Sequence, residues 1–400
     1  MVKRWCFLFI AAGLMLTAGS SICRAQAPTP PSVGRSEDEE AWRKSMSRTP
    51  LPRHGCFHAS YPSTEWLEVP CVTAPPIPHG LSQGPTREAR AATVGGAGGD
   101  YLAESSALIS SVMASFPFAV VASEADSAYG SDAFTLQINS NFFPTGLCGA
   151  TPYPECSGAE QFIFDNDASG LFSGVYIQNW LIYKGAIPPC PPSWYTGPNG
   201  CFINSAMTPV SHGQIADLAG WDFWGAAANG TDTVILGGAG IYANEQDSVL
   251  GLSQEWNTAE FNVFGYGNGS EANFSSGTTL AVQMDVNTTG TLTCAPGGFT
   301  VEMNNLTLAN PCLAVGLPAT IYFIESNAGP SAAPSVSTGS ASAVTTTSAV
   351  LNGSASGNGT PSLAWFQWSA SNDLDAVPQY SPCPRSQAPS ASPIAKPFTG

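Results

Sequence analysis

The sequence predicts an all-β protein whose main part is one large antiparallel β-sandwich. Between residues 97 and 327 the chain is a series of short segments rich in β-branched and aromatic residues, separated by stretches rich in Gly, Asn, Thr and Ser. Those segments are FTLQINSNFF, GVYIQNWLIY, DTVILGGAGIYA, EFNVFGYG, TTLAVQMDV and ATIYFIES. Only two stretches fit a helix, part of DYLAESSALISSVMASF and EQDSVLGLSQEW. Many strands, few helices and a length of about 230 residues favour a single sandwich core.

The period of a half-buried strand is clearest in TTLAVQMDV. There Leu280, Val282, Met284 and Val286 fall on every second position, so one face of the strand is apolar. In DTVILGGAGIYA a pair of glycines, 237–238, separates two apolar runs and predicts a hairpin turn.

The first 27 residues have the pattern of a secretory signal peptide. Lys3 and Arg4 precede the apolar run WCFLFIAAGLMLTAG, and the small residues of SSICRAQA follow it. The run is shorter than the roughly 20 apolar residues that a membrane-spanning helix needs. We therefore expect cleavage near Ala25 or Ala27, a secreted protein, and no stable membrane insertion.

Residues 28–96 have the composition of a leader. They are rich in Pro, they carry most of the basic residues of the chain, and they end in the flexible sequence VGGAGG. Two interpretations follow: a propeptide that docks on the acidic body (97–327) through its positive charge, or a disordered leader.

The composition changes again after residue 327. Within residues 328–370, the strand-like VTTTSAVLNGSAS, the turn GNGTP and the strand-like SLAWFQW resemble the first half of a bacterial fibronectin type III-like module. Residues 371–400 are rich in Pro and Ser, which predicts a disordered tail.

The cysteines indicate disulfides. Removing Cys6 and Cys23 from the 11 leaves nine, and eight of these lie in close pairs. The pairs are Cys56 with Cys71, Cys148 with Cys156, Cys190 with Cys201, and Cys294 with Cys312. An exported chain without C-x-x-C spacings favours disulfide bonds over metal binding, so we expect no metal. Cys383 has no partner in this scheme.

The charge of the chain excludes several partners. The net charge is −16 and the pI is near 4.4, so nucleic acid and anionic membrane surfaces would be repelled. Two interpretations of this acidity stay open: a soluble secreted protein, or a protein that works at acid pH, where many of its carboxylates are neutral. We expect a monomer.

Two catalytic templates can be set aside. The G-x-S-x-G at 80–84 lies in a Pro-rich linker rather than at a strand-to-helix turn, and His212 is the only histidine of the body. The G-x-G-x-x-A at 238–243 has no β–α alternation around it, so a hairpin turn is favoured over dinucleotide binding. No cofactor is expected.

A carboxylate remains. The segment TAEFNVFGYGNGSEANFSSGTTLAV resembles the surroundings of the catalytic glutamate in the eqolisins, the secreted glutamic peptidases, and this resemblance places Glu260 at the catalytic position. CSGAEQFIFDNDASGLFSGVYIQNWLIYKG resembles their glutamine-bearing region, with Gln161 as the partner and Gln178 as the alternative. The resemblance spans residues 130–290 and departs from the family pattern after Gln161. It implies an eqolisin-like sandwich and an endopeptidase with a polypeptide substrate.

The chemistry would need neither a metal nor a histidine. Glu260 could act as general base and then general acid, its pKa raised by the apolar neighbours Phe261 and Trp256. A glutamine amide could hold the water and donate to the oxyanion. The competing interpretation is a strand-end glutamate that reaches solvent or accepts a backbone N–H. If Glu260 is catalytic, the aromatic residues Tyr176, Trp180 and Trp256 would contact the substrate.

A second class of function stays open. The eqolisin sandwich is similar in architecture to concanavalin-like lectins and glucanases, so the same strands could bind a polysaccharide without catalysis. GWDFWG at 220–225 and PPSWYTGPNG at 191–200 would supply stacking rings. A glycosidase would need two close carboxylates from Glu255, Glu260 and Glu271. A cell-surface interaction protein is the third interpretation.

Overall fold

The computed structural model describes residues 37–81, 93–96, 99–149, 156–169, 173–316 and 319–328, and five short segments after residue 334. Those five segments are 335–342, 348–356, 365–368, 379–382 and 392–399. The expected signal peptide, 1–27, and Cys383 lie outside the described residues. Residues 33–328 form one compact unit, and the strands after residue 328 belong to another.

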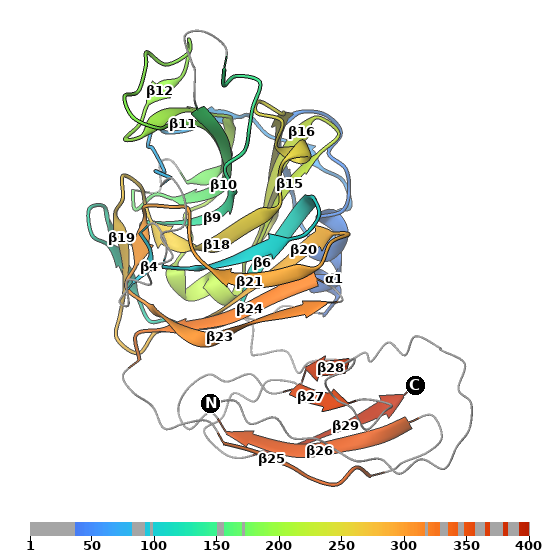
Figure 1. Cartoon of the computed structure of the whole chain (residues 1–400). Coiled ribbons are helices and arrows are strands. Elements are labelled where there is room, and N and C mark those ends of the chain that lie inside the picture. Colours follow the sequence, from blue (N-terminus) through green and yellow to red (C-terminus); the bar gives the residue numbers. More distant parts are fainter. Residues whose placement is uncertain are drawn as a thin grey trace. The chain divides into compact units, whose positions relative to one another are not determined.

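The first large sheet of the main unit has nine antiparallel strands (Figure 1). In spatial order these are β2 (Leu67–Glu68), β1 (Gly55–Ala59), β17 (Ile241–Asp247), β16 (Thr231–Gly237), β15 (Asp222–Ala228), β6 (Ile109–Val120), β20 (Thr279–Thr288), β24 (Ala319–Ser326) and β23 (Thr307–Gly316). Strands β16 and β17 form the hairpin expected around the paired glycines.

The second large sheet has ten strands. Its main path is β12 (Tyr195–Thr196), β13 (Gly200–Asn204), β11 (Gly174–Tyr183), β10 (Cys156–Asn166), β9 (Phe134–Ser140), β18 (Thr258–Gly265), β5 (Tyr101–Ser105) and β21 (Leu292–Pro296). Off this path β14 (Ala206–Pro209) pairs with β11 and with β3 (Val72–Thr73).

Smaller elements complete the described chain. A five-stranded sheet contains β4 (Val94–Gly95), β22 (Met303–Asn304), β19 (Glu271–Phe274), β7 (Glu124–Asp126) and β8 (Gly130–Ser131). The helical elements are α1 (Glu37–Met46), η1 (Ile215–Gly220) and η2 (Leu252–Gln254). The second unit has a sheet of β25 (Ser335–Thr338), β26 (Ser348–Ser356) and β29 (Ser392–Thr399), and a pair of β27 (Trp365–Trp368) with β28 (Gln379–Pro382). The last two strands of the chain, β28 and β29, fall within 371–400, where the composition predicts disorder.

The apolar faces of the two large sheets form one core between them. Leu280, Val282, Met284 and Val286 of β20 are all buried there, as their alternation predicts. They share the core with side chains of the ten-stranded sheet, among them Phe261 of β18. The predicted all-β sandwich is therefore confirmed.

The two expected helices are wrong. Residues 101–105 and 109–120 form β5 and β6, and residues 245–247 end β17 ahead of the short η2 turn. Small, helix-compatible residues such as Ala114 and Ser115 alternate between buried and half-buried in β6. Because β6 pairs with both β15 and β20, sheet pairing outweighs a weak helix preference.

The four predicted disulfides are all present, Cys56–Cys71, Cys148–Cys156, Cys190–Cys201 and Cys294–Cys312. The last of them joins β21, an edge of the ten-stranded sheet, to β23, an edge of the nine-stranded sheet. It therefore ties the two layers of the sandwich together at one side.

The leader sequence is part of the sandwich unit from residue 37 to residue 81. Strand β1 pairs with β17 and extends the nine-stranded sheet, while β3 pairs with β14 of the other sheet. Helix α1 packs through Trp42 and Met46 on a small apolar cluster, and Arg43 forms a largely buried ion pair with Asp222. The leader thus contacts the body through apolar packing, strand pairing and charge together.

We expect Trp42→Ala to lower the free energy of unfolding by about 3 kcal/mol, because it removes a buried indole that anchors α1. Trp42 is 7% exposed and packs edge-on against Tyr61. Thermal and denaturant unfolding measure the effect, and Lys44→Ala, on the exposed side of the same helix, is the matched control. Equal unfolding midpoints for the two variants would show that α1 does not stabilise the unit.

Candidate functional site

A row of polar side chains crosses the ten-stranded sheet. Gln178 of β11 is paired with Gln161 of β10, Gln161 with Asn139 of β9, and Asn139 with Glu260 of β18. We call these four in-register residues the polar row. Ile138 and Phe261, the chain neighbours of Asn139 and Glu260, point into the inter-sheet core. Since successive side chains of a strand point to opposite faces, the polar row lies on the other face of the sheet.

The polar row is closed to solvent. All four of its side chains are 0% exposed, although an outward sheet face ordinarily meets water. Two segments cover it: residues 299–302, and residues 74–81 of the leader, which we call the strap. A buried polar group without a partner is costly, so each amide and carboxylate here must find hydrogen bonds.

Hydrogen bonds link the polar row from end to end. Trp180 Nε1 donates to Gln161 Oε1 at 2.7 Å and to Gln178 Oε1 at 2.9 Å. Gln161 Nε2 donates to Asn139 Oδ1 at 2.9 Å, and Asn139 Nδ2 donates to Glu260 Oε2 at 2.9 Å. Asn139, rather than a glutamine, is therefore the amide beside Glu260, and Gln161 orients it.

Glu260 is closed off from solvent, so the interpretation as a solvent-reaching strand end is wrong, whereas the alternative of a glutamate that accepts a backbone N–H agrees with the structure. Its Oε2 also accepts the backbone N–H groups of Phe299 at 2.9 Å and Thr300 at 3.2 Å. Among the residues that the structure describes, its Oε1 has no hydrogen-bond partner. Burial raises the pKa of Glu260 to about 7, and the three hydrogen bonds oppose that rise.

The source of this burial differs from the expectation. Phe261 and Trp256 both pack in the inter-sheet core, on the other side of β18. The indole of Trp256 lies against Phe162, and its Nε1 donates to the Thr258 carbonyl. The covering segments, not these two rings, exclude water from the carboxylate, and Trp256 does not lie on the polar row.

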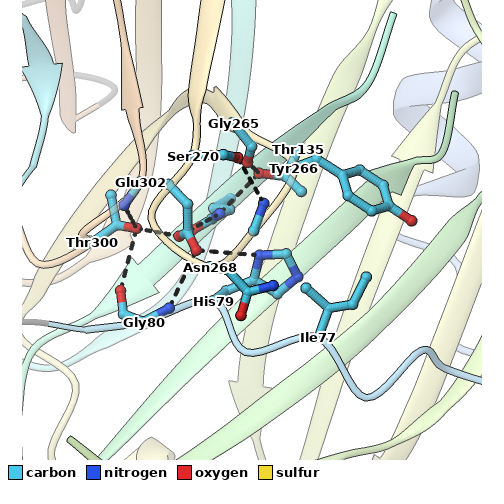
Figure 2. A network of polar contacts seen from close by, with 12 residues as sticks. Ile77, His79, Gly80, Thr135, Gly265, Tyr266, Asn268, Ser270, Thr300 and Glu302 are labelled. Carbon is cyan, nitrogen blue, oxygen red and sulfur yellow. Dashed lines mark hydrogen bonds and ion pairs between the residues drawn. The ribbon is translucent and has the colours of Figure 1, made fainter. Parts of the chain in front are cut away.

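Glu302 is a second buried carboxylate, and Figure 2 shows its polar contacts. It accepts hydrogen bonds from Thr300 Oγ1 at 2.6 Å and from Gln137 Nε2 at 3.2 Å. Gln137 in turn accepts from Gln161 Nε2 at 3.1 Å, which joins Glu302 to the polar row. Burial raises the pKa of Glu302 to about 7 as well.

The strap contacts Glu302 and Tyr176. The Gly80 N–H donates to Glu302 Oε1 at 3.2 Å, and His79 Nδ1 lies 3.8 Å from the same oxygen, as Figure 2 shows. His79 Nε2 lies 2.9 Å from the hydroxyl of Tyr176. Burial lowers the pKa of His79 to about 3, so the imidazole is neutral across the weakly acidic range. One leader histidine, His79, therefore lies at the site, although nothing in the sequence predicts it there.

The structure brings most of the predicted site residues together and leaves others apart. Glu260, Gln161 and Gln178 share the polar row; Trp180 of β11 donates to it, and Tyr176 of the same strand contacts the strap at His79. The rings proposed for sugar stacking differ among themselves: Trp221 and Trp224 are buried, while Tyr195 is exposed. Glu255 and Glu271, offered as glycosidase partners, are only half-buried.

Asn139 could have been found from the sequence. In FTLQINS, Gln137 and Asn139 alternate with apolar residues, so both belong on the face opposite the core. Nothing local marks Glu302, Thr300 or the strap. They reach the polar row through pairings such as that of Leu81 with Thr300, more than 200 residues apart in the chain.

The arrangement offers acid–base chemistry through carboxylates and amides. Within the described ranges, no three His, Cys, Asp or Glu side chains are grouped as metal ligands. Nor, in that part of the chain, is any helix long and apolar enough to cross a membrane.

We expect Asn139→Ala to raise the pKa of Glu260 further, because the lost amide hydrogen bond favours the charged carboxylate. Carbon-13 NMR of glutamate-labelled protein follows the titration, with the resonance assigned by its absence from Glu260→Gln. Asn273→Ala, whose amide contacts a backbone carbonyl on β19, is the control. An unchanged or lowered pKa in Asn139→Ala would contradict the hydrogen-bond assignment.

Comparison with models of protein families, with curated proteins and with solved structures finds no match for this chain.

Proposed function

We propose that the chain is a secreted endopeptidase of the glutamic type, acting at acid pH, with Glu260 as its proton-transferring group. The observation that carries the proposal is the strap: this peptide is held by Gln178 at one end of the polar row and pairs through Leu81 with Thr300, whose N–H binds Glu260. His79 N–H donates to Gln178 Oε1 at 2.9 Å, and Gln178 Nε2 donates to the Ile77 carbonyl at 3.0 Å. A surface that holds a peptide backbone in this way suits a polypeptide substrate.

Peptide hydrolysis requires a water that is activated and an oxyanion that is stabilised. The free oxygen of Glu260, Oε1, is the group that would bind the water and exchange a proton with it. Asn139 is the side-chain amide that binds this carboxylate, and it would donate to the developing negative charge. Gln161 acts as a positioning residue, because it holds Asn139 through Oδ1.

The acidic working range follows from the same site. With the strap in place the pKa of Glu260 is about 7, so the group is protonated at acid pH. When the covering peptide is replaced by substrate and water, the carboxylate is less desolvated and its pKa falls toward the ordinary glutamate value. A carboxyl group that moves between these two environments can both give and take a proton.

The lectin alternative has less support. Of the rings proposed to stack on sugars, Trp221 packs against Phe134 in the core and Trp224 belongs to the cluster beneath α1.

Export through the proposed signal peptide agrees with the four disulfides.

Digestion of an acid-denatured protein tests the proposal, with the leader cut from the body after folding both in the chain with Glu260 and in the Glu260→Gln variant. We expect hydrolysis that depends on Glu260. Retention on a polysaccharide resin without any hydrolysis would instead favour the binding protein.

A further inference from the structure

The strap, residues 74–81, is bound like a ligand although it belongs to the same chain. We infer that the strap is an internal substrate-like peptide that blocks the polar row, and that the vacated site binds an extended polypeptide with leucine at the position of Leu81. The inhibitory part of this inference rests on the proposed function. The peptide-binding part does not.

The main chain of the strap is recognised along its length. Besides the two bonds to Gln178, Asn204 Nδ2 donates to the Pro75 carbonyl at 2.9 Å, and the Asn268 N–H donates to the Pro78 carbonyl at 3.0 Å. The Val301 N–H donates to the Gly80 carbonyl at 2.9 Å. Because these contacts use backbone atoms, any extended peptide could repeat them, as in recognition by strand addition.

Leu81 supplies a side-chain anchor. It is 0% exposed and belongs to an apolar cluster whose members include Leu102, Trp180 and Phe299. Leu102 is paired with Glu260 across β18 and β5, and Trp180 donates to Gln161. The cluster is therefore adjacent to the polar row, and it would select a large aliphatic side chain beside the reacting bond.

The strap also fits its neighbours closely. A Cβ built on Gly267 would lie 2.4 Å from Ile77 Cγ2, and one built on Gly80 would lie 2.6 Å from Val301 Cγ2. Proline at 75, 76 and 78 keeps this segment extended and lowers the entropy lost on binding. Such a tethered peptide competes with free substrate at an effective concentration on the order of millimolar.

The test uses the full chain and a fluorescent peptide with the sequence of residues 74–82, APPIPHGLS, measured by polarisation. The wild-type chain is expected not to bind the probe, because its own strap fills the site. A variant with His79→Ala and Leu81→Ala, in which the strap is weakened, is expected to bind it saturably. Adding Gln178→Ala to that variant should weaken binding by about 10-fold or more, since two hydrogen bonds to the probe are lost.

Two controls define the specificity. A probe in which alanine replaces the leucine should bind about 10-fold more weakly, because the apolar anchor is missing. Adding Leu108→Ala, at an exposed position of the main unit, to the weakened variant should leave probe binding unchanged. Equal binding by wild type and the weakened variant would overturn the inference, and so would no binding by a weakened variant that unfolds cooperatively.

A second form of the protein guards against misfolding of the weakened variant. A processing-protease site inserted within residues 82–92 allows the wild-type strap to be cut from the body after folding. The cut protein should then exchange its strap for an excess of probe, and failure to exchange would count against a displaceable ligand. Probe binding without hydrolysis by any form would leave the peptide site standing and refute the proposed function. Full hydrolysis by the uncut wild-type chain would leave the proposed function standing and refute inhibition.

Discussion

In the protein cut within residues 82–92, replacing Glu260 by glutamine is expected to lower kcat for hydrolysis of a denatured protein at about pH 4 by about 10²–10⁴-fold, the usual contribution of a general acid–base group. Glutamine keeps the shape of the side chain and can keep one acceptor oxygen for the Phe299 and Thr300 N–H groups. It cannot transfer the proton. The fold and the unfolding temperature at acid pH should therefore survive, because a protonated glutamate and a glutamine are both neutral.

The matched control for this change is Glu104→Gln. Glu104 is exposed on β5, and its neighbour across the strand pair is Thr258, two residues before Glu260. Its loss removes one carboxylate from the same part of the sheet without touching the polar row, so kcat should be unchanged. If both variants retain wild-type kcat, Glu260 is not the proton-transferring group.

The second large effect is on stability, which we expect to be highest at acid pH and to fall as the pH rises. Burial raises the pKa of Glu260 and Glu302 to about 7, and that of Glu325 to about 8. The folded state therefore holds these protons more tightly than the unfolded state does. As the pH rises above about 4.5, the unfolded chain loses its protons first, and folding becomes less favourable.

The size of that loss follows from the pKa values. A rise from an ordinary glutamate value to about 7 corresponds to stability on the order of 3 kcal/mol for Glu260, which is present below about pH 4.5 and lost above about pH 7. Denaturant titrations from about pH 4 to pH 8 measure the sum over the buried acids. Glu302→Gln should make the free energy of unfolding change less with pH, because the glutamine amide stays neutral at every pH. Stability that is constant or rises over the range would contradict the buried, protonated state of these groups.

The sandwich could be predicted because its signal is local. Alternation in segments such as 279–288 assigns one face of each strand to the core, and close spacing in sequence was enough to pair the eight cysteines. The same local reasoning failed at 109–120, where alanine and serine permit a helix and pairing with two neighbouring strands decides otherwise. Local preference is a weak guide where sheet contacts can override it.

The site was only partly predictable for a related reason. Glu260 and Gln161 could be proposed from their neighbours in the sequence, but their separation could not, because it depends on β9 lying between β10 and β18. That strand order places Asn139 in the position proposed for a glutamine. The segment that covers Glu260, residues 299–302, is likewise distant in the sequence, and so is the strap, whose Leu81 pairs with Thr300.

Acid digestion by the protein cut within residues 82–92 tests the central claim most directly. Two preparations, one with Glu260 and one carrying Glu260→Gln, are cut in the same way. Both are incubated with a denatured protein substrate at about pH 4, close to the ordinary pKa of a glutamate that acts as general acid and base. Mass spectrometry then identifies the new peptide ends. The proposed function predicts new ends, enriched in positions near leucine, from the Glu260 preparation alone. New ends in equal amounts from both preparations, or none from either while the probe peptide still binds, would contradict it.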